Sequence, residues 1–222
     1  MAGKEANAAA ESRKKSRNQF EATKLSAAQR NIHVYAQIAS IGNFIFLISD
    51  MLFIQGQTER MIVAITRYCF SILLILLVRK LQRVRSFANF AALVTILEAA
   101  SILLYLVVLW LYESPDFMIQ SMGVILTILV IYVVPNRSEN VLTLSILSAI
   151  AYFAFSYYFI KDVPLKSFFA AMVYVTLTIV ICAARTLGTE RYAQREFLAK
   201  ANLQETSAKD YLTNAATRAR LE

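Results

Sequence analysis

Three ionisable residues, Asp50, Arg67 and Glu98, lie inside long apolar stretches of the sequence. A charged side chain at membrane depth is costly unless it is paired or hydrated, so each of the three is a candidate functional residue. At about 1.5 Å per helical residue, the three lie at similar depths, within a turn or two of each other. The arginine side chain is therefore predicted to reach Asp50, Glu98 or both.

Three interpretations of this trio follow from its chemistry. In the first, Arg67 pairs with a carboxylate only to hold three helices together. In the second, the trio and Asn43 line a pocket in which a proton or the polar head of a small apolar or amphipathic ligand is sensed, and the excess carboxylate is uncompensated. In the third, the same residues conduct protons or ions through the membrane.

The elements that carry these residues are predicted from composition. Hydrophobic residues make up 58% of the 222 positions and charged residues only 17%, with a mean hydropathy of +0.51, which lies outside the balance of soluble proteins. The five glycines and three prolines are too few for a chain built of turns, so long membrane helices are expected. A β-barrel, a disulfide scaffold and a disordered chain are excluded.

Six apolar stretches are long enough to cross a bilayer, given some tolerance for tilt. They are residues 32–54, 61–78, 87–112, 117–134, 141–160 and 165–184. Pro115, Pro135 and Pro164 all fall at predicted helix ends, where a missing backbone N–H costs least. The predicted fold is an all-α polytopic membrane protein with six transmembrane helices, followed by a cytoplasmic coiled-coil signalling helix.

The basic residues predict the orientation in the membrane. Lys and Arg cluster in residues 1–30, 79–85 and 185–200, whereas the opposite connections are richer in acidic residues. By the positive-inside rule both termini are cytoplasmic, and the net charge of +8 is a topology signal, with no nucleic acid expected as a partner. We expect a multi-pass membrane protein without a cleaved secretory signal, because the N-terminus is polar through about Arg30.

The connections on the outer side are too short to hold a folded domain. Any signal is therefore expected within the bilayer, beside it, or on the cytoplasmic face. Residues 1–30 carry Phe20 and Leu25 among basic residues. They are predicted to form either an interfacial helix on the anionic inner leaflet or a solvated, disordered tail.

The sequence offers little for metals or haem. Cys69 and Cys182 lie in apolar stretches with no partner at metal-ligand spacing, so we expect plain core or lipid-facing residues. His33 is the only histidine, and a haem would need two copies of it across a dimer. We therefore expect no metal, haem or other cofactor in this chain.

After Arg185 the sequence becomes polar and strongly helix-forming. A seven-residue repeat places Leu187, Gln194, Ala201 and Ala208 on one seam position and Arg191, Leu198, Glu205 and Leu212 on the other. The apolar members Leu187, Leu198, Ala201 and Ala208 give this segment a partial coiled-coil seam. The polar members make the seam too weak to hold a dimer alone, and an amphipathic juxtamembrane helix remains the alternative.

Residues 210–222 carry the motif that suggests a family. Asp210, Leu212, Thr213 and Arg218, followed by Leu221-Glu222, match the pattern D-x-L-T, an Arg five residues after the Thr, and an apolar-acidic pair. This segment resembles the opening of the GGDEF domain of bacterial diguanylate cyclases. The match is partial, because Asn214-Ala215 stands where Gly-Leu is usual and Thr217 where Asn is usual.

The resemblance implies that residues 31–185 form a six-helix sensor domain, residues 186–209 the coiled-coil linker, and residues 210–222 the start of a truncated GGDEF domain. The catalytic signature is missing from this sequence, so the chain as given is expected not to be an enzyme, and its parent protein to be a homodimeric diguanylate cyclase. The missing domain would use Mg²⁺ and GTP in a two-metal reaction.

Two functions of other classes remain open. A small transporter or channel would use Asp50, Arg67 and Glu98 as its permeation site. Such proteins often contain internal repeats and helices broken near the midplane, and neither is evident in the sequence. A passive anchor would supply only membrane location and dimerisation.

Overall fold

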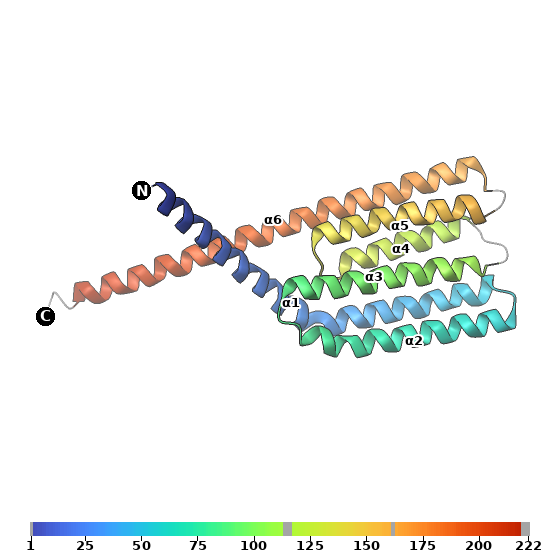
Figure 1. Ribbon diagram of the computed structural model, residues 1–222, viewed down its shortest axis with the longest axis horizontal. Helices are drawn as coiled ribbons and strands as arrows, with labels where there is room; N and C mark the ends of the chain where they lie inside the picture. The colour runs from blue at the N-terminus through green and yellow to red at the C-terminus, as the bar shows by residue number, and fades with distance from the viewer. Residues whose placement is uncertain (1, 113–116, 161–162, 219–222) are drawn as a thin grey trace. The chain divides into compact units, whose positions relative to one another are not determined.

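The computed structural model describes the backbone of residues 2–112, 117–160 and 163–218, and the side chains of residues 18–112, 117–160 and 163–203. Within these ranges the regular secondary structure is α-helix, joined by short connections, with no strand. The helices are α1 (Ala2–Phe53), α2 (Gln57–Gln82), α3 (Phe87–Trp110), α4 (Phe117–Val133), α5 (Ser138–Phe159) and α6 (Leu165–Arg218). The chain divides into two compact units, Met1–Ala183 and Ala184–Glu222, and the first contains the helical bundle (Figure 1).

Five helices, α1, α2, α3, α5 and α6, contain segments long and apolar enough to cross a membrane. The sixth apolar helix, α4, has 17 residues and at about 1.5 Å per residue is shorter than a bilayer core of roughly 30 Å. The predicted all-α architecture is therefore confirmed for the described residues, and five of the six stretches lie in helices long and apolar enough to cross a membrane. The fourth stretch is a helix at the expected position but is shorter than a usual span.

The outward surface of the bundle is apolar, as a lipid environment requires. On α1, Ile41, Ile45, Ile48 and Leu52 follow the spacing of one helical face and are 59%, 60%, 65% and 73% exposed. Large contiguous apolar surfaces of this kind are rare on soluble proteins. In a bilayer they are satisfied by lipid or by another protein.

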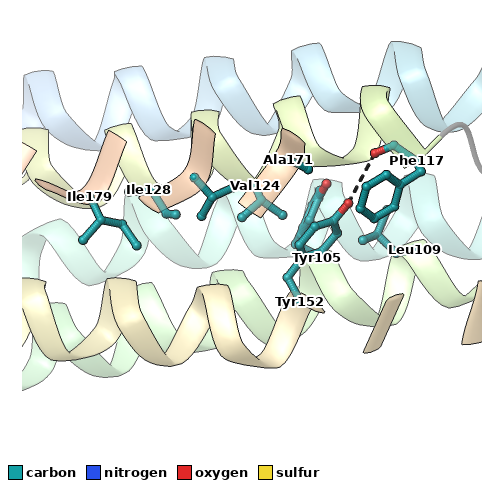
Figure 2. Packing of buried hydrophobic residues seen from close by; sticks show 9 residues of the cluster. Tyr105, Leu109, Phe117, Val124, Ile128, Tyr152, Ala171 and Ile179 are labelled. Atoms are coloured by element: carbon teal, nitrogen blue, oxygen red, sulfur yellow. Dashed lines mark hydrogen bonds between the residues drawn. The ribbon is translucent and has the colours of Figure 1, made fainter. Parts of the chain in front are cut away.

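The largest buried cluster joins α3, α4, α5 and the first part of α6 (Figure 2). It consists of Tyr105, Leu109, Phe117, Val124, Ile128, Tyr152, Ala171, Val175 and Ile179. The Phe117 and Tyr152 rings stack with centroids 6.1 Å apart. The Tyr152 hydroxyl lies 2.9 Å from Ser121 Oγ, which donates to the Phe117 carbonyl oxygen, so the hydroxyl of this buried tyrosine is hydrogen-bonded within the bundle.

The helix connections define two ends of the bundle. We call the end that carries the α2–α3 and α4–α5 connections the near end, and the end that carries the α1–α2 and α5–α6 connections the far end (Figure 1). Pro135 lies between α4 and α5, and Pro164 directly precedes α6. Both prolines therefore lie at helix boundaries as predicted, and Pro115 lies outside the described residues.

At the near end, α1 begins well before the predicted span. Leu25, Ala28 and Ile32 are buried together with Val78 and Phe87 in one cluster. The place of this segment on the inner leaflet or in solvent stays a prediction, and from Asn18 onward its described part continues α1 as one helix. The apolar residues at i, i+3 and i+7 of α1 supply the reason, because they continue one face of the spanning helix beyond residue 32.

Gln29 fixes this extension of α1 to the α2–α3 connection. Its Nε2 atom lies 3.0, 3.1 and 2.7 Å from the carbonyl oxygens of Leu81, Gln82 and Val84. The last carbonyls of a helix have no partner within the helix. The Gln29 amide supplies donors to these groups and so caps α2 from a neighbouring helix.

Candidate functional site

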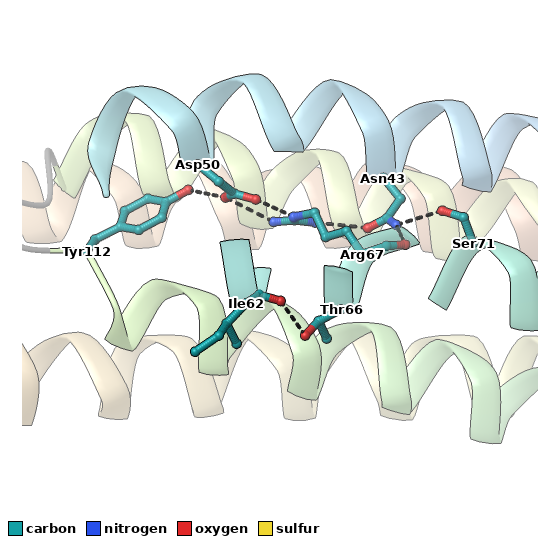
Figure 3. A network of polar contacts seen from close by, with 7 residues as sticks. All are labelled: Asn43, Asp50, Ile62, Thr66, Arg67, Ser71 and Tyr112. Carbon is teal, nitrogen blue, oxygen red and sulfur yellow. Dashed lines mark hydrogen bonds and ion pairs between the residues drawn. The ribbon is translucent and has the colours of Figure 1, made fainter. Parts of the chain in front are cut away.

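Arg67 and Asp50 form a buried ion pair between α2 and α1 (Figure 3). Arg67 Nε donates to Asp50 Oδ2, and Arg67 Nη2 donates to Asp50 Oδ1 over 3.1 Å. Asp50 is fully buried and Arg67 is 3% exposed. Two parallel donors matched to two carboxylate oxygens give the fork geometry that stabilises such a pair away from water.

Asn43 extends this pair along the α1–α2 interface. Arg67 Nη1 donates to Asn43 Oδ1 over 2.9 Å, while Asn43 Nδ2 donates to the Arg67 carbonyl oxygen over 2.8 Å and to Ser71 Oγ over 2.9 Å. Asn43 and Asp50 are seven residues apart, and Arg67 and Ser71 are four apart. Each pair therefore lies on one face of its helix, and the two faces meet (Figure 3).

Tyr112, just after the end of α3, completes this network. Its hydroxyl donates to Asp50 Oδ1 over 2.7 Å, and its ring stacks on Phe53 with centroids 5.6 Å apart. Asp50 therefore accepts hydrogen bonds from two directions. We call Asn43, Asp50, Arg67, Ser71 and Tyr112 the Arg67 network.

Glu98 belongs to a second polar group, nearer the near end of the bundle. Asn136, in the α4–α5 connection, donates through Nδ2 to Glu98 Oε2 over 2.9 Å and to Thr95 Oγ1 over 2.9 Å. Asn140 also donates to Thr95 Oγ1, over 3.1 Å. The other carboxylate oxygen, Glu98 Oε1, is buried and has no hydrogen-bond partner among the described residues.

A cavity of about 140 Å³ lies between α1, α2, α3 and α4, and side chains of both polar groups line it. Asn43 and Arg67 contribute from one side, and Glu98 contributes from α3. Most of the remaining wall is apolar and includes Phe46 and Leu74. A concave apolar site with a few convergent polar groups is the usual form of a small-molecule pocket.

The structure places Asp50 and Arg67 in one polar group and Glu98 in another. The pairing of Arg67 with Asp50 is confirmed, whereas Glu98 has no ion-pair contact with Arg67 among the described residues. Asn43 contacts Arg67 directly, as its place in the predicted group requires. The equal-depth argument failed for Glu98 because depth along a helix does not determine which face of α3 turns toward α2.

Five residues of the two polar groups were not predicted from the sequence: Ser71, Thr95, Tyr112, Asn136 and Asn140. Ser71 had a usable signal, since it lies one turn after Arg67 on the same helical face. Tyr112 had none, because its contact with Asp50 is made across 62 positions of sequence. Asn136 also had no local signal, since its partners lie on a different helix.

The residues that could bind a metal ion or haem do not cluster. Within the described side chains, no group of three or more His, Cys, Asp or Glu residues could hold a metal ion. Cys69 is an exposed thiol and Cys182 a partly buried one. His33 is exposed, and its Nε2 lies 2.7 Å from Gln82 Nε2 at the near end.

The second unit carries the predicted signalling linker on α6. Leu187 and Leu198 are 46% and 52% exposed, and Ala201 is also exposed. Lys200 Nζ donates to Glu196 Oε1 over 2.6 Å, one turn away, and this contact lowers the pKa of the Glu196 carboxyl. The linker thus presents apolar side chains beside a solvated charge pair.

The family motif lies beyond the described side chains. Ala208, Asp210, Leu212, Thr213 and Arg218 all lie within α6, but their side chains are outside the described residues. Comparisons with models of known protein families, with curated proteins and with solved structures find no match to this chain. The similarity of residues 210–222 to the opening of a GGDEF domain therefore stays a prediction.

Proposed function

We propose that this chain is the membrane sensor and dimerisation module of a bacterial diguanylate cyclase. It regulates the synthesis of cyclic di-GMP from two GTP molecules by a GGDEF domain that follows residue 222. The observation that carries the proposal is the extent of α6, which begins at Leu165 in an apolar stretch and continues without a break to Arg218. One helix therefore contains both the last apolar stretch and the segment that resembles the opening of a GGDEF domain.

The mechanism follows from the chemistry of the reaction. Joining two GTP molecules bound to facing protomers requires the two catalytic domains to meet, so the output depends on how paired linkers hold them. A ligand of the bundle changes the output only through a difference in its affinity for the productive and unproductive arrangements. Mg²⁺ and GTP belong to the catalytic domain.

The linker supports a dimer but is weak by itself. Leu187, Leu198 and Ala201 are exposed and available to a partner helix, whereas Arg191 and Gln194 interrupt the same seam. A homodimer therefore needs a contribution from the bundle, whose apolar outer faces can pack against a second copy in the bilayer. In this proposal six spans cross a bacterial inner membrane, and both termini are cytoplasmic.

A transporter or channel is the alternative, and the unbroken apolar helices count against it. Among the described residues, α1, α2, α3, α5 and α6 each run through their apolar segments without interruption, whereas transporter sites are typically built on broken helices. A passive anchor would need no cavity with charged walls. Both alternatives are outcomes of the experiment that follows.

The test joins a GGDEF domain after Glu222 and measures cyclic di-GMP in membranes. One residue is inserted after Ala199, which rotates everything beyond it by about 100°. A seven-residue insertion at the same point is the matched control, because it returns the helix close to its original face. Equal protein levels in the membrane are verified for each fusion.

We expect the one-residue insertion to change cyclic di-GMP synthesis several-fold and the seven-residue insertion to restore it largely. Equal synthesis in all three fusions would contradict signal transmission through the linker and favour a passive anchor. Ion or solute flux through the unfused chain in vesicles, abolished by Arg67→Leu, would favour the transporter.

A further inference from the structure

The cavity between α1 and α4 has an unusual charge balance. Arg67, in its wall, is engaged by both oxygens of Asp50 and by Asn43, so its charge is already neutralised. Glu98, also in the wall, is 8% exposed and has no cation within salt-bridge distance among the described residues. The group left without a countercharge is therefore a carboxylate.

The hydrogen bonding of Glu98 shows the same imbalance. A carboxylate offers about four acceptor positions on its two oxygens, and Asn136 occupies one of those on Oε2. Oε1 is buried without a partner in the described part of the chain. A buried polar atom of this kind is costly until a donor reaches it.

We propose that this cavity binds a small amphipathic amine, whose ammonium group pairs with Glu98 Oε1 and whose apolar part occupies the space between α1 and α2. The inference deepens the proposed sensor role and rests on it only for the consequence of binding. An ammonium group carries three donors and a positive charge, so it satisfies both the missing hydrogen bond and the missing countercharge. An anionic ligand would meet Glu98 unfavourably and find the Arg67 guanidinium already engaged.

The volume of the cavity limits the size of the apolar part of the amine. An apolar cavity of roughly 150 Å³ accommodates benzene, and this one measures about 140 Å³. The walls near Glu98 include aromatic and aliphatic side chains such as Phe70, Leu74 and Val94. A single ring joined to an aminomethyl group therefore matches the volume, the apolar walls and the position of the carboxylate.

A substitution of Gly42 tests the role of the cavity volume independently of Glu98. It lines the cavity from α1, and a Cβ atom built on it meets no other atom within 4 Å. The Cβ of a leucine at this position therefore meets open space, and leucine is also a better helix former than glycine. Gly42→Leu removes space, whereas Glu98→Gln removes charge.

The test measures binding of benzylamine to the 222-residue chain in nanodiscs by isothermal titration calorimetry at neutral pH, where the amine is protonated. Toluene, benzyl alcohol and benzoate are the neutral and anionic probes of the same size. The proteins are the unaltered chain, Glu98→Gln, Gly42→Leu and the matched control Glu139→Gln, which neutralises an exposed carboxylate of α5 near the same end. Empty nanodiscs correct for partition into lipid.

We expect benzylamine to bind the unaltered chain and Glu139→Gln equally, at least tenfold more weakly to Glu98→Gln, and not measurably to Gly42→Leu. Benzoate should not bind. Equal binding of benzylamine to Glu98→Gln, or tighter binding of benzyl alcohol or toluene than of benzylamine, would overturn the proposal. So would the absence of saturable benzylamine binding to the unaltered chain.

The fused cyclase separates this inference from the proposed function. Benzylamine binding that depends on Glu98 but leaves cyclic di-GMP synthesis unchanged supports the site and counts against the sensor role. Synthesis that depends on linker phase, in a protein that binds no amine, supports the transmission mechanism and removes the site.

Discussion

The Tyr112 hydroxyl donates a hydrogen bond of 2.7 Å to Asp50 Oδ1, which joins the end of α3 to the α1–α2 interface near the far end of the bundle. The same carboxylate accepts two donors from Arg67 on α2. One fully buried side chain therefore connects three helical segments. Its loss should affect the whole bundle, because buried charges are stable only in complete networks.

Asp50→Ala should destabilise the bundle by about 3–5 kcal/mol, because it leaves the Arg67 guanidinium buried without its ion-pair partner. The double variant Asp50→Leu/Arg67→Leu should recover much of this loss, since it removes both charges. Thermal unfolding in detergent, monitored by circular dichroism, measures both effects. Tyr112→Phe is the control and should cost only about 1 kcal/mol. Equal stability of Asp50→Ala and the unaltered chain would contradict the pair.

Gly123→Ala should destabilise the α3–α4 contact by about 1–3 kcal/mol through overpacking. A Cβ atom at this position would lie 2.4 Å from Tyr105 Oη, and that hydroxyl donates to the Gln120 carbonyl oxygen over 2.7 Å. The tyrosine must therefore move and lose its hydrogen bond. Unfolding measurements on Gly42→Ala provide the control, because that Cβ meets nothing within 4 Å, and this variant should be neutral or stabilised.

Gln29→Ala should loosen the near end of the bundle without unfolding it. The variant removes the two N–H donors that the carbonyl oxygens of Leu81, Gln82 and Val84 share, and one such hydrogen bond is worth roughly 0.5–1.5 kcal/mol. Hydrogen exchange of the amides in residues 80–86 should become faster, while exchange at the far end should not change. Gln19→Ala, an exposed glutamine of the same helix, should leave both regions as they are. Faster exchange throughout the bundle would show that the effect is not local.

Reporter fusions test the topology that the Lys and Arg distribution predicts. A fusion after Glu113 should report the periplasm, and a fusion after Gln194 should report the cytoplasm. Cysteine labelling at the same two positions in intact cells is the independent measurement. Reports of one compartment from both positions would show that the number of spans between them is even, which would exclude α4 or another helix as a span.

The sequence by itself determined the existence of the helices and the place of the apolar stretch in each of them. Apolar runs of about 20 residues bounded by charges or proline have one stable backbone solution in a bilayer, since every N–H and C=O must bond within its own segment. Residues 87–112 and 117–134 accordingly correspond to α3 (Phe87–Trp110) and α4 (Phe117–Val133). The pairing of Arg67 with a carboxylate was also predictable, because an isolated guanidinium is too costly at that depth.

Only the tertiary structure decided that Arg67 pairs with Asp50. It also decided that Glu98 is hydrogen-bonded to Asn136. The partners of Glu98 and Tyr112 depend on the rotation of α3 about its axis and on the course of the α4–α5 connection. A helix that is apolar on nearly every side leaves that rotation undetermined from sequence, because no face is marked for the interior. Packing against neighbouring helices fixes the rotation, and with it the position of Glu98 in the cavity wall.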